Sequence, residues 1–131
     1  MVMTPGTYLR IRREAARLSL EDLALRIGTD PRLSTRDRAE WLRTVEAGIA
    51  PIHSVSLDAL VRALPIDPVV LVVLDAIAQG AEIKAPAICR VCGCSEHNPC
   101  IVADSYCAWA APDLCDACAP GAGSPAEAIA A

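Results

Sequence analysis

The sequence predicts a mainly α-helical protein that carries a small, irregular, cysteine-rich metal module behind its helices. Apolar residues recur at helical spacing between capping residues over the first 80 positions, without a convincing strand. All seven cysteines lie between Cys89 and Cys118. The chain has 131 residues, of which 53% are hydrophobic and 21% charged, which excludes a disordered polar chain. We therefore expect a helical domain over 1–80, a zinc-binding module over 81–119 and a disordered tail over 120–131.

Charge is distributed unevenly along the chain. The formal net charge is −4, yet residues 1–67 contain ten arginines against nine acidic residues. Residues 68–131 contain two basic and seven acidic residues. An acidic chain is not expected to bind nucleic acid over its whole surface, but guanidinium groups suit phosphate and base-edge contacts. A solvated helix surface explains the same arginines equally well.

Several classes of protein are disfavoured by missing features. The first residues, MVMTPGTYLRIRRE, contain no apolar signal region, and the longest apolar run, 69–74, is six residues long. We therefore expect a cytoplasmic protein without a membrane partner, in which clustered cysteines bind metal instead of forming disulfides. A phosphate-binding loop, a nucleophile elbow, an H-E-x-x-H motif and a paired set of carboxylates are all missing, so we do not expect an enzyme.

The first two helices are predicted around a turn at Leu18. Residues 7–17 show rough helical spacing of apolar positions. Ser19 is followed three residues later by Asp22, a pattern that resembles a capping box and begins a helix over the sequence LEDLALRI. Gly28 is expected to end that helix in the left-handed conformation.

Three further helices follow turn-rich segments. Ser34 or Thr35 can cap a helix over 36–47, whose apolar stripe contains Trp41 and which Gly48 closes. Ser56 is expected to cap a helix over 57–64 that Pro65 ends. Asp67 and Pro68 begin a last helix over 69–78, which ends at Gly80, because proline is favoured at the first helical position.

The cysteine pattern predicts a structural zinc site. Two C-x2-C pairs, 22 residues apart, are typical of a tetrahedral zinc ion held by four thiolates. The predicted ligands are Cys89, Cys92, Cys115 and Cys118. Gly93 fits the tight turn after the first pair. About 30 residues with few large apolar side chains cannot fold around a core alone, so a metal ion is needed.

The remaining candidate ligands leave a second metal site open. They are Cys94, His97, Cys100 and Cys107. Because Cys94 is two residues from Cys92, two zinc ions would have to lie close together or share a ligand. An iron–sulfur cluster also takes four thiolates, and the three cysteines of this set could instead be thiols that respond to oxidants. A catalytic zinc is disfavoured, because four thiolates leave no open coordination position.

The first half of the chain resembles the helix-turn-helix domain of phage repressors and their bacterial relatives. The resemblance rests on Leu9–Arg10, 13–16, 18–24 and Gly28, and further along on 45–48 and 56–64. It covers about residues 7–64 and implies a five-helix domain whose third helix reads DNA. The stretch from Gly28 to Glu46 is several residues longer than in that family. Either the turn is enlarged or the recognition helix is lengthened.

This resemblance implies a set of DNA contacts. Arginines in the N-terminal half of a recognition helix reach guanine edges or phosphates, while residues before the preceding helix approach the backbone. The expected contacts are Arg17, Ser19, Thr35, Arg36, Arg38 and Arg43.

The second half resembles a cysteine-rich segment of small phage and prophage proteins. The residues that carry this resemblance are 89–94, Cys100, Cys107, Trp109 and 112–115. Together the two resemblances imply a small transcriptional regulator of phage or prophage type that binds double-stranded DNA, with a homodimer as the expected assembly. The alternative is an adaptor without DNA binding, in which both modules serve as scaffolds for a host or phage protein.

Overall fold

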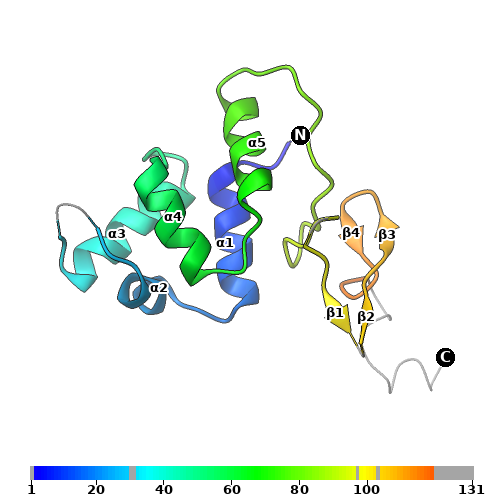
Figure 1. The fold of residues 1–131 in the computed structure, drawn as a ribbon, viewed down its shortest axis with the longest axis horizontal. Coiled ribbons are helices and arrows are strands. Elements are labelled where there is room, and N and C mark those ends of the chain that lie inside the picture. The colour runs from blue at the N-terminus through cyan, green and yellow to red at the C-terminus, as the bar shows by residue number, and fades with distance from the viewer. Residues whose placement is uncertain (1, 30–31, 97, 103, 120–131) are drawn as a thin grey trace. The chain divides into compact units, whose positions relative to one another are not determined.

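The computed structural model describes residues 2–29, 32–96, 98–102 and 104–119. The chain divides into two compact units, Met1–Ala85 and Pro86–Ala131, which are treated separately below (Figure 1). The division falls five residues after the expected boundary at position 80. The expected tail, 120–131, lies outside the described residues.

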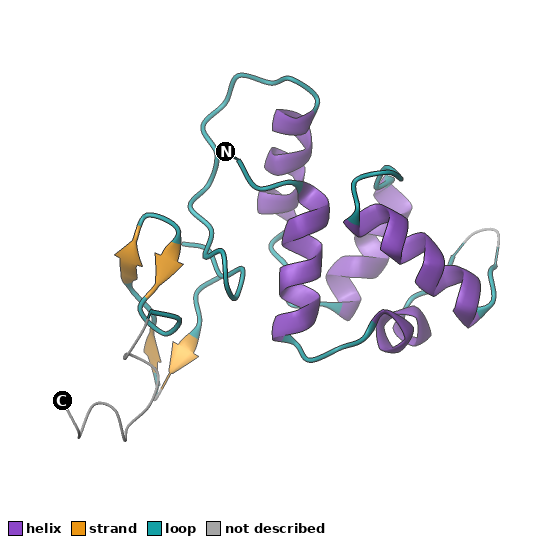
Figure 2. Cartoon of the chain, turned by 180° about the vertical axis from the view of Figure 1, so that it is seen from behind, coloured by secondary structure: helices purple, strands orange, loops and turns teal. Residues whose placement is uncertain are grey.

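The first unit is helical, as its sequence predicts. Among the described residues of this unit there is no strand (Figure 2). Its helices are α1 (Pro5–Ala15), α2 (Leu20–Arg26), α3 (Thr35–Glu46), α4 (Ser54–Ala63) and α5 (Pro68–Ala78). Helix α3 packs against α2 and α1, and α1 also packs against α5. No helix in the described part of the chain has both the length and the apolar character that crossing a membrane requires.

Local capping chemistry explains most of the helix starts. The Ser19 hydroxyl accepts from the Asp22 N–H at 3.0 Å, and the Asp22 carboxylate accepts from the Ser19 N–H at 2.9 Å, which confirms the capping box. Ser34 caps α3 with one such bond, because its hydroxyl accepts from the Asp37 N–H at 3.1 Å. Asp67 caps α5 with Pro68 in its first turn, as expected.

Two predicted helix boundaries are wrong. Helix α4 begins at Ser54, with His53 as an N-cap that makes no side-chain hydrogen bond, so Ser56 lies inside the helix and not at its cap. Helix α2 ends with Ile27 in an extended conformation, and Gly28 does not have the positive φ of a left-handed cap. Among the described glycines of this unit, those that do adopt positive φ are Gly48 at +78° and Gly80 at +104°, where α3 and α5 end.

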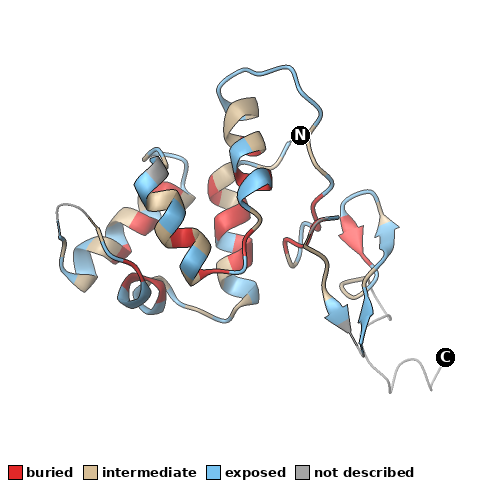
Figure 3. Cartoon of the chain, viewed as in Figure 1, coloured by how far each residue is buried: buried red, intermediate tan, exposed pale blue. Residues whose placement is uncertain are grey.

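The helices enclose an aliphatic core around one buried tyrosine (Figure 3). Tyr8 and the leucines Leu23, Leu42, Leu60 and Leu74 are fully buried. The Tyr8 hydroxyl accepts a hydrogen bond of 2.9 Å from the Asp67 N–H, and burial raises the pKa of this phenol. The buried Arg12 guanidinium donates from Nε to the Pro65 carbonyl at 2.8 Å. Both contacts hold α1 to the segment between α4 and α5.

The C-terminal end of α3 contacts α1 at two places. Arg13 donates to both carboxylate oxygens of Glu46, at 2.7 and 2.9 Å, and these side chains are only 12% and 10% exposed. At the other end of α1, a Cβ on Gly6 would lie 2.4 Å from the Glu46 carbonyl oxygen. The two helices approach so closely here that only glycine fits.

The second unit contains two short antiparallel hairpins. Strand β1 (Ile101–Val102) pairs with β2 (Ser105–Tyr106), and β3 (Trp109–Ala111) pairs with β4 (Leu114–Cys115) with a shift of register. Its buried cluster consists of Cys89, Cys94, Leu114 and Cys115. This unit therefore has thiols where an ordinary domain has large apolar side chains.

Candidate functional site

A tight turn presents the first three cysteines. The Gly93 N–H donates to the Cys89 carbonyl, and the Cys89 N–H donates to the Cys94 carbonyl, both at 2.9 Å. Gly93 has a φ of +76°, which confirms the turn expected after the first C-x2-C pair. Cys89, Cys92 and Cys94 are thereby held on one short loop.

A second segment brings Cys115 to this loop. The Arg90 N–H donates to the Asp113 carbonyl at 2.8 Å, and the Arg90 guanidinium pairs with the Asp113 carboxylate at 2.5 Å. This double contact aligns strand β4 with the turn, so that the buried Cys115 faces it. Arg90 and Asp113, which are 23 positions apart in the sequence, are therefore held side by side by a backbone hydrogen bond and an ion pair.

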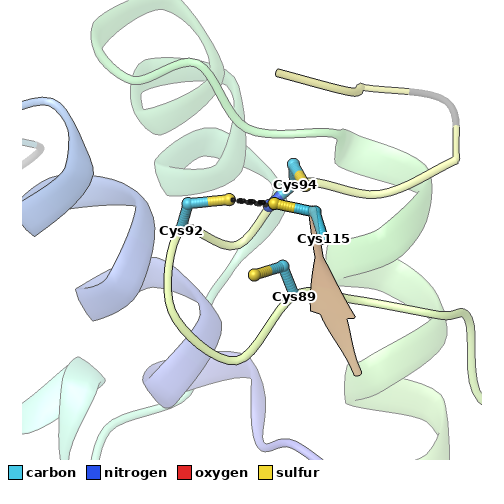
Figure 4. Close-up of side chains that lie close together, drawn as sticks. All are labelled: Cys89, Cys92, Cys94 and Cys115. Carbon is cyan, nitrogen blue, oxygen red and sulfur yellow. Dashed lines mark hydrogen bonds between the residues drawn. The ribbon is translucent and has the colours of Figure 1, made fainter. Parts of the chain in front are cut away.

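The first thiol group comprises Cys89, Cys92, Cys94 and Cys115. All four sulfur atoms lie within 4.8 Å of one another. Figure 4 shows the Cys92 and Cys115 sulfurs pointing toward each other, and their separation is 3.8 Å. Tetrahedral metal–thiolate geometry with bonds of about 2.3 Å places its sulfurs about 3.8 Å apart. These four thiols could hold a metal ion.

The second thiol group comprises Cys94, Cys100, Cys107 and Cys115, again within 4.8 Å of one another. Cys100 and Cys107 flank the β1–β2 hairpin, where the Cys107 N–H donates to the Cys100 carbonyl at 2.9 Å. The Cys100 N–H donates to the Cys107 sulfur at 3.2 Å, and the Cys107 and Cys94 sulfurs are 3.8 Å apart. This group could hold a metal ion as well.

The pKa values of the thiols are shifted in different directions. Burial raises the pKa of Cys89, but hydrogen bonds from the backbone of Cys115, Cys92 and Val91 outweigh it and lower the pKa to about 6. Burial and the neighbouring Cys92 raise the pKa of Cys94, and they raise that of Cys100 to about 12. Crowded thiols cannot all ionise without a compensating positive charge, which a bound cation supplies.

The predicted zinc ligands are placed as follows. Cys89, Cys92 and Cys115 fall in the first group together with Cys94. Cys118 belongs to neither group of four, but it is partly buried against the cluster, and its N–H donates to the Cys115 carbonyl at 3.1 Å. Burial and hydrogen bonding with the thiols of Cys115, Cys92 and Cys89 raise the pKa of Cys118, so its sulfur lies beside those of its three predicted partners.

The predicted second set is partly assembled. Its three cysteines, Cys94, Cys100 and Cys107, come together with Cys115. His97 lies outside the described residues. Sequence spacing missed that Cys94 and Cys115 belong to both groups. The C-x-C spacing of Cys92 and Cys94 was the signal available for it.

The predicted DNA contacts fall around α2 and α3. Ser19 is used as the cap of α2, and Thr35 begins α3. Arg38 donates to the Ile27 carbonyl and to the Thr35 hydroxyl, so its guanidinium links α3 to the end of α2. Arg43 is exposed but pairs with Glu40 at 2.6 Å.

The remaining predicted contacts, Arg17 and Arg36, are exposed, and neither makes an ion pair or side-chain hydrogen bond within the described residues. Arg17 adopts a positive φ of 60° in the turn between α1 and α2. Arg36 lies in the first turn of α3.

The chain matches no family model, no curated protein and no solved structure. The resemblance to phage repressors therefore stays a prediction, and the functional argument rests on the chain's own residues.

Proposed function

We propose that the protein is a small DNA-binding regulator whose second unit is folded around zinc. The DNA-binding part rests on a difference among the arginines of the helical unit, some of which bond inside the unit while others are exposed. Arg12, Arg13 and Arg38 are committed to contacts inside the unit. The arginines that flank α2 and α3 are instead exposed, with no ion pair or side-chain hydrogen bond to any described residue. These are Arg17, Arg26, Arg32 and Arg36.

In this proposal α2 and α3 act as a helix-turn-helix pair with α3 as the reading helix. The loop between them runs over 27–34, longer than the usual turn of about 3–4 residues. Arg38 supports the pair, because its bond to the Ile27 carbonyl fixes where α2 ends against α3. Arg36 is then the residue best placed to reach a guanine edge or a phosphate, and Arg17 a phosphate.

Zinc is the metal that the donor set favours. Both groups consist of thiolates, which select soft or borderline ions and disfavour magnesium and calcium. An iron–sulfur cluster places several sulfide-bridged irons between its thiolates and so separates them widely. Sulfurs that lie within 4.8 Å of one another instead fit around a single ion. Bound zinc supplies positive charge and a rigid tetrahedral centre, so its role here is structural.

Salt-dependent binding to duplex DNA tests the regulator proposal. Full-length protein should bind random-sequence DNA at low ionic strength, with an affinity that falls steeply as salt is added. Replacing Arg36 with Ala should weaken binding and lower the salt slope by about one. Arg62→Ala is the matched control, because Arg62 is an exposed arginine on α4 and its loss should change binding little. No salt-sensitive binding by the wild-type chain would refute the proposal.

A role as a protein-binding adaptor is the second candidate, and a cleft with exposed apolar side chains favours it. This cleft, of about 590 Å³, lies on the second unit and is lined by Ile101, Tyr106 and Trp109 together with the polar Ser95, Glu96 and Asn98. Ile101 is 70% exposed and Tyr106 74% exposed, which is unusual for side chains of this size. A stoichiometric partner that is lost on Tyr106→Ala, together with no DNA binding, would favour the adaptor.

A further inference from the structure

The two thiol groups share two of their members. Cys94 and Cys115 belong to both, so that six different sulfurs make two complete sets of four. Both shared residues are fully buried, at 1% and 0% exposure. The four unshared sulfurs divide evenly, with Cys89 and Cys92 on one side and Cys100 and Cys107 on the other.

Among the described thiols, ligand number favours sharing over two separate sites. Two closed tetrahedral sites with separate ligands need eight donors, whereas the chain has seven cysteines, and His97, the eighth donor of the predicted sets, lies outside the described residues. Sharing two sulfurs reduces the requirement to six, which is the number that the two groups contain. A thiolate has enough lone pairs to bind two metal ions at once.

Distances within each group agree with one bound ion. Each group contains a sulfur pair separated by 3.8 Å, Cys92 with Cys115 and Cys94 with Cys107, the spacing of a metal–thiolate tetrahedron. Cys92 and Cys100, which belong to different groups, are 3.4 Å apart, so the two groups adjoin each other. The outer sulfurs of two tetrahedra that share an edge lie about 5 Å apart, so this pair must separate when both ions bind.

Backbone donors lie at the outer ligands of this arrangement. The Cys94 N–H donates to the Cys92 sulfur at 3.5 Å, and the Cys100 N–H donates to the Cys107 sulfur at 3.2 Å. Such N–H···S bonds spread the negative charge of a thiolate bound to one metal ion.

We propose that the second unit holds a binuclear zinc–thiolate centre in which Cys94 and Cys115 bridge the two ions. Cys89 and Cys92 complete the coordination of one ion, and Cys100 and Cys107 that of the other. Cys118 is then the one cysteine that binds neither ion. This inference rests on the metal binding proposed above and is independent of DNA binding.

Cadmium-113 spectroscopy of the full-length protein tests the bridge directly. Protein loaded with ¹¹³Cd²⁺ should bind two ions per chain and give two resonances, each split by coupling to the other ion through the shared sulfurs. Two unsplit resonances, or one ion per chain at saturation, would overturn the bridged centre. Binding of no metal at all would instead refute the zinc part of the proposed function, so the two failures are distinguishable.

Serine variants provide a second test with a matched control. Zinc content measured by native mass spectrometry should remain two ions per chain in Cys118→Ser and fall to one in Cys107→Ser. If Cys118 completes a single site with Cys89, Cys92 and Cys115, its replacement lowers the metal content, which would contradict the bridged centre. The cadmium measurement on the unaltered chain stands even if a variant fails to fold.

Discussion

The two units of this chain are held together by different chemistry. The helical unit encloses a core of leucines around Tyr8, and it also contains the capping box of α2 and the Arg13–Glu46 pair. The cysteine-rich unit has one large apolar side chain, Leu114, in its buried cluster, and thiols take the remaining places. The first unit therefore has an apolar core of its own, whereas the second, on the metal binding proposed above, depends on an ion that neutralises and joins its sulfurs.

Removing the metal should give the largest difference in stability between the two units. With a strong chelator under reducing conditions, the second unit should unfold, because structural zinc contributes about 10–16 kcal/mol to such modules. Amide resonances from residues 86–119 should collapse while those from 2–85 stay dispersed in a nuclear magnetic resonance spectrum. Adding zinc back should restore them. Persistence of the full spectrum without metal would show that the two units do not differ in this way.

A cavity in the helical core should affect the first unit alone. Leu42 is fully buried on α3, so Leu42→Ala should lower the free energy of unfolding by about 2–5 kcal/mol, measured by urea denaturation. Zinc content should not change. Ile49→Ala is the control, because Ile49 is 77% exposed and its truncation should cost no more than about 0.5 kcal/mol.

The partly buried ion pair between α1 and α3 should contribute less to the free energy of unfolding than the core. Glu46→Gln retains the shape of the side chain but removes the charge that Arg13 faces, so we expect a loss of about 1.5–3 kcal/mol by thermal or urea unfolding. Glu40→Gln removes an exposed carboxylate that pairs with Arg43, and it should cost under about 1 kcal/mol. Equal effects of the two variants would contradict the importance of burial at Glu46.

The capping box of α2 should make the smallest contribution to the stability of the folded state, and this contribution should depend on pH. Hydrogen bonds from the Ser19 N–H and side chain lower the pKa of Asp22 below its usual range. A carboxyl group with a lowered pKa stabilises the folded state above its unfolded pKa of about 3.9, and this contribution is lost as the pH falls through the folded value. The stability difference between wild type and Asp22→Asn should therefore be present at pH 7 and shrink below about pH 4. A difference that is independent of pH would argue against the charged cap.

Local signals predicted the helical unit well. Serine or aspartate caps marked the starts of α2, α3 and α5, because capping chemistry acts over three residues and is visible in the sequence. The start of α4 was missed because His53 makes no side-chain cap. Gly28 was misread because a glycine near a helix end permits, but does not require, a left-handed conformation.

Long-range partners were beyond the reach of the sequence. The bond between the Arg38 guanidinium and the Ile27 carbonyl, eleven residues away, has no signal in the sequence. Sequence spacing favoured Cys118, which is part of a C-x2-C pair, over Cys94 as a ligand of the first site. Only the fold of the β3–β4 hairpin against the turn at Gly93 brings Cys94 into both groups of four and leaves Cys118 out of them.

Because aromatic residues are scarce, the fluorescence of each unit can be measured separately. The chain has two tryptophans and two tyrosines, and one of each lies in either unit: Tyr8 and Trp41 in the first, Tyr106 and Trp109 in the second. Replacing Trp109 with Phe leaves Trp41, on α3, as the one tryptophan, and its emission reports on the helices. Replacing Trp41 leaves Trp109, on β3 beside the thiols, whose emission should change when metal enters. Two single-tryptophan proteins thus turn one chain into a pair of independent optical probes.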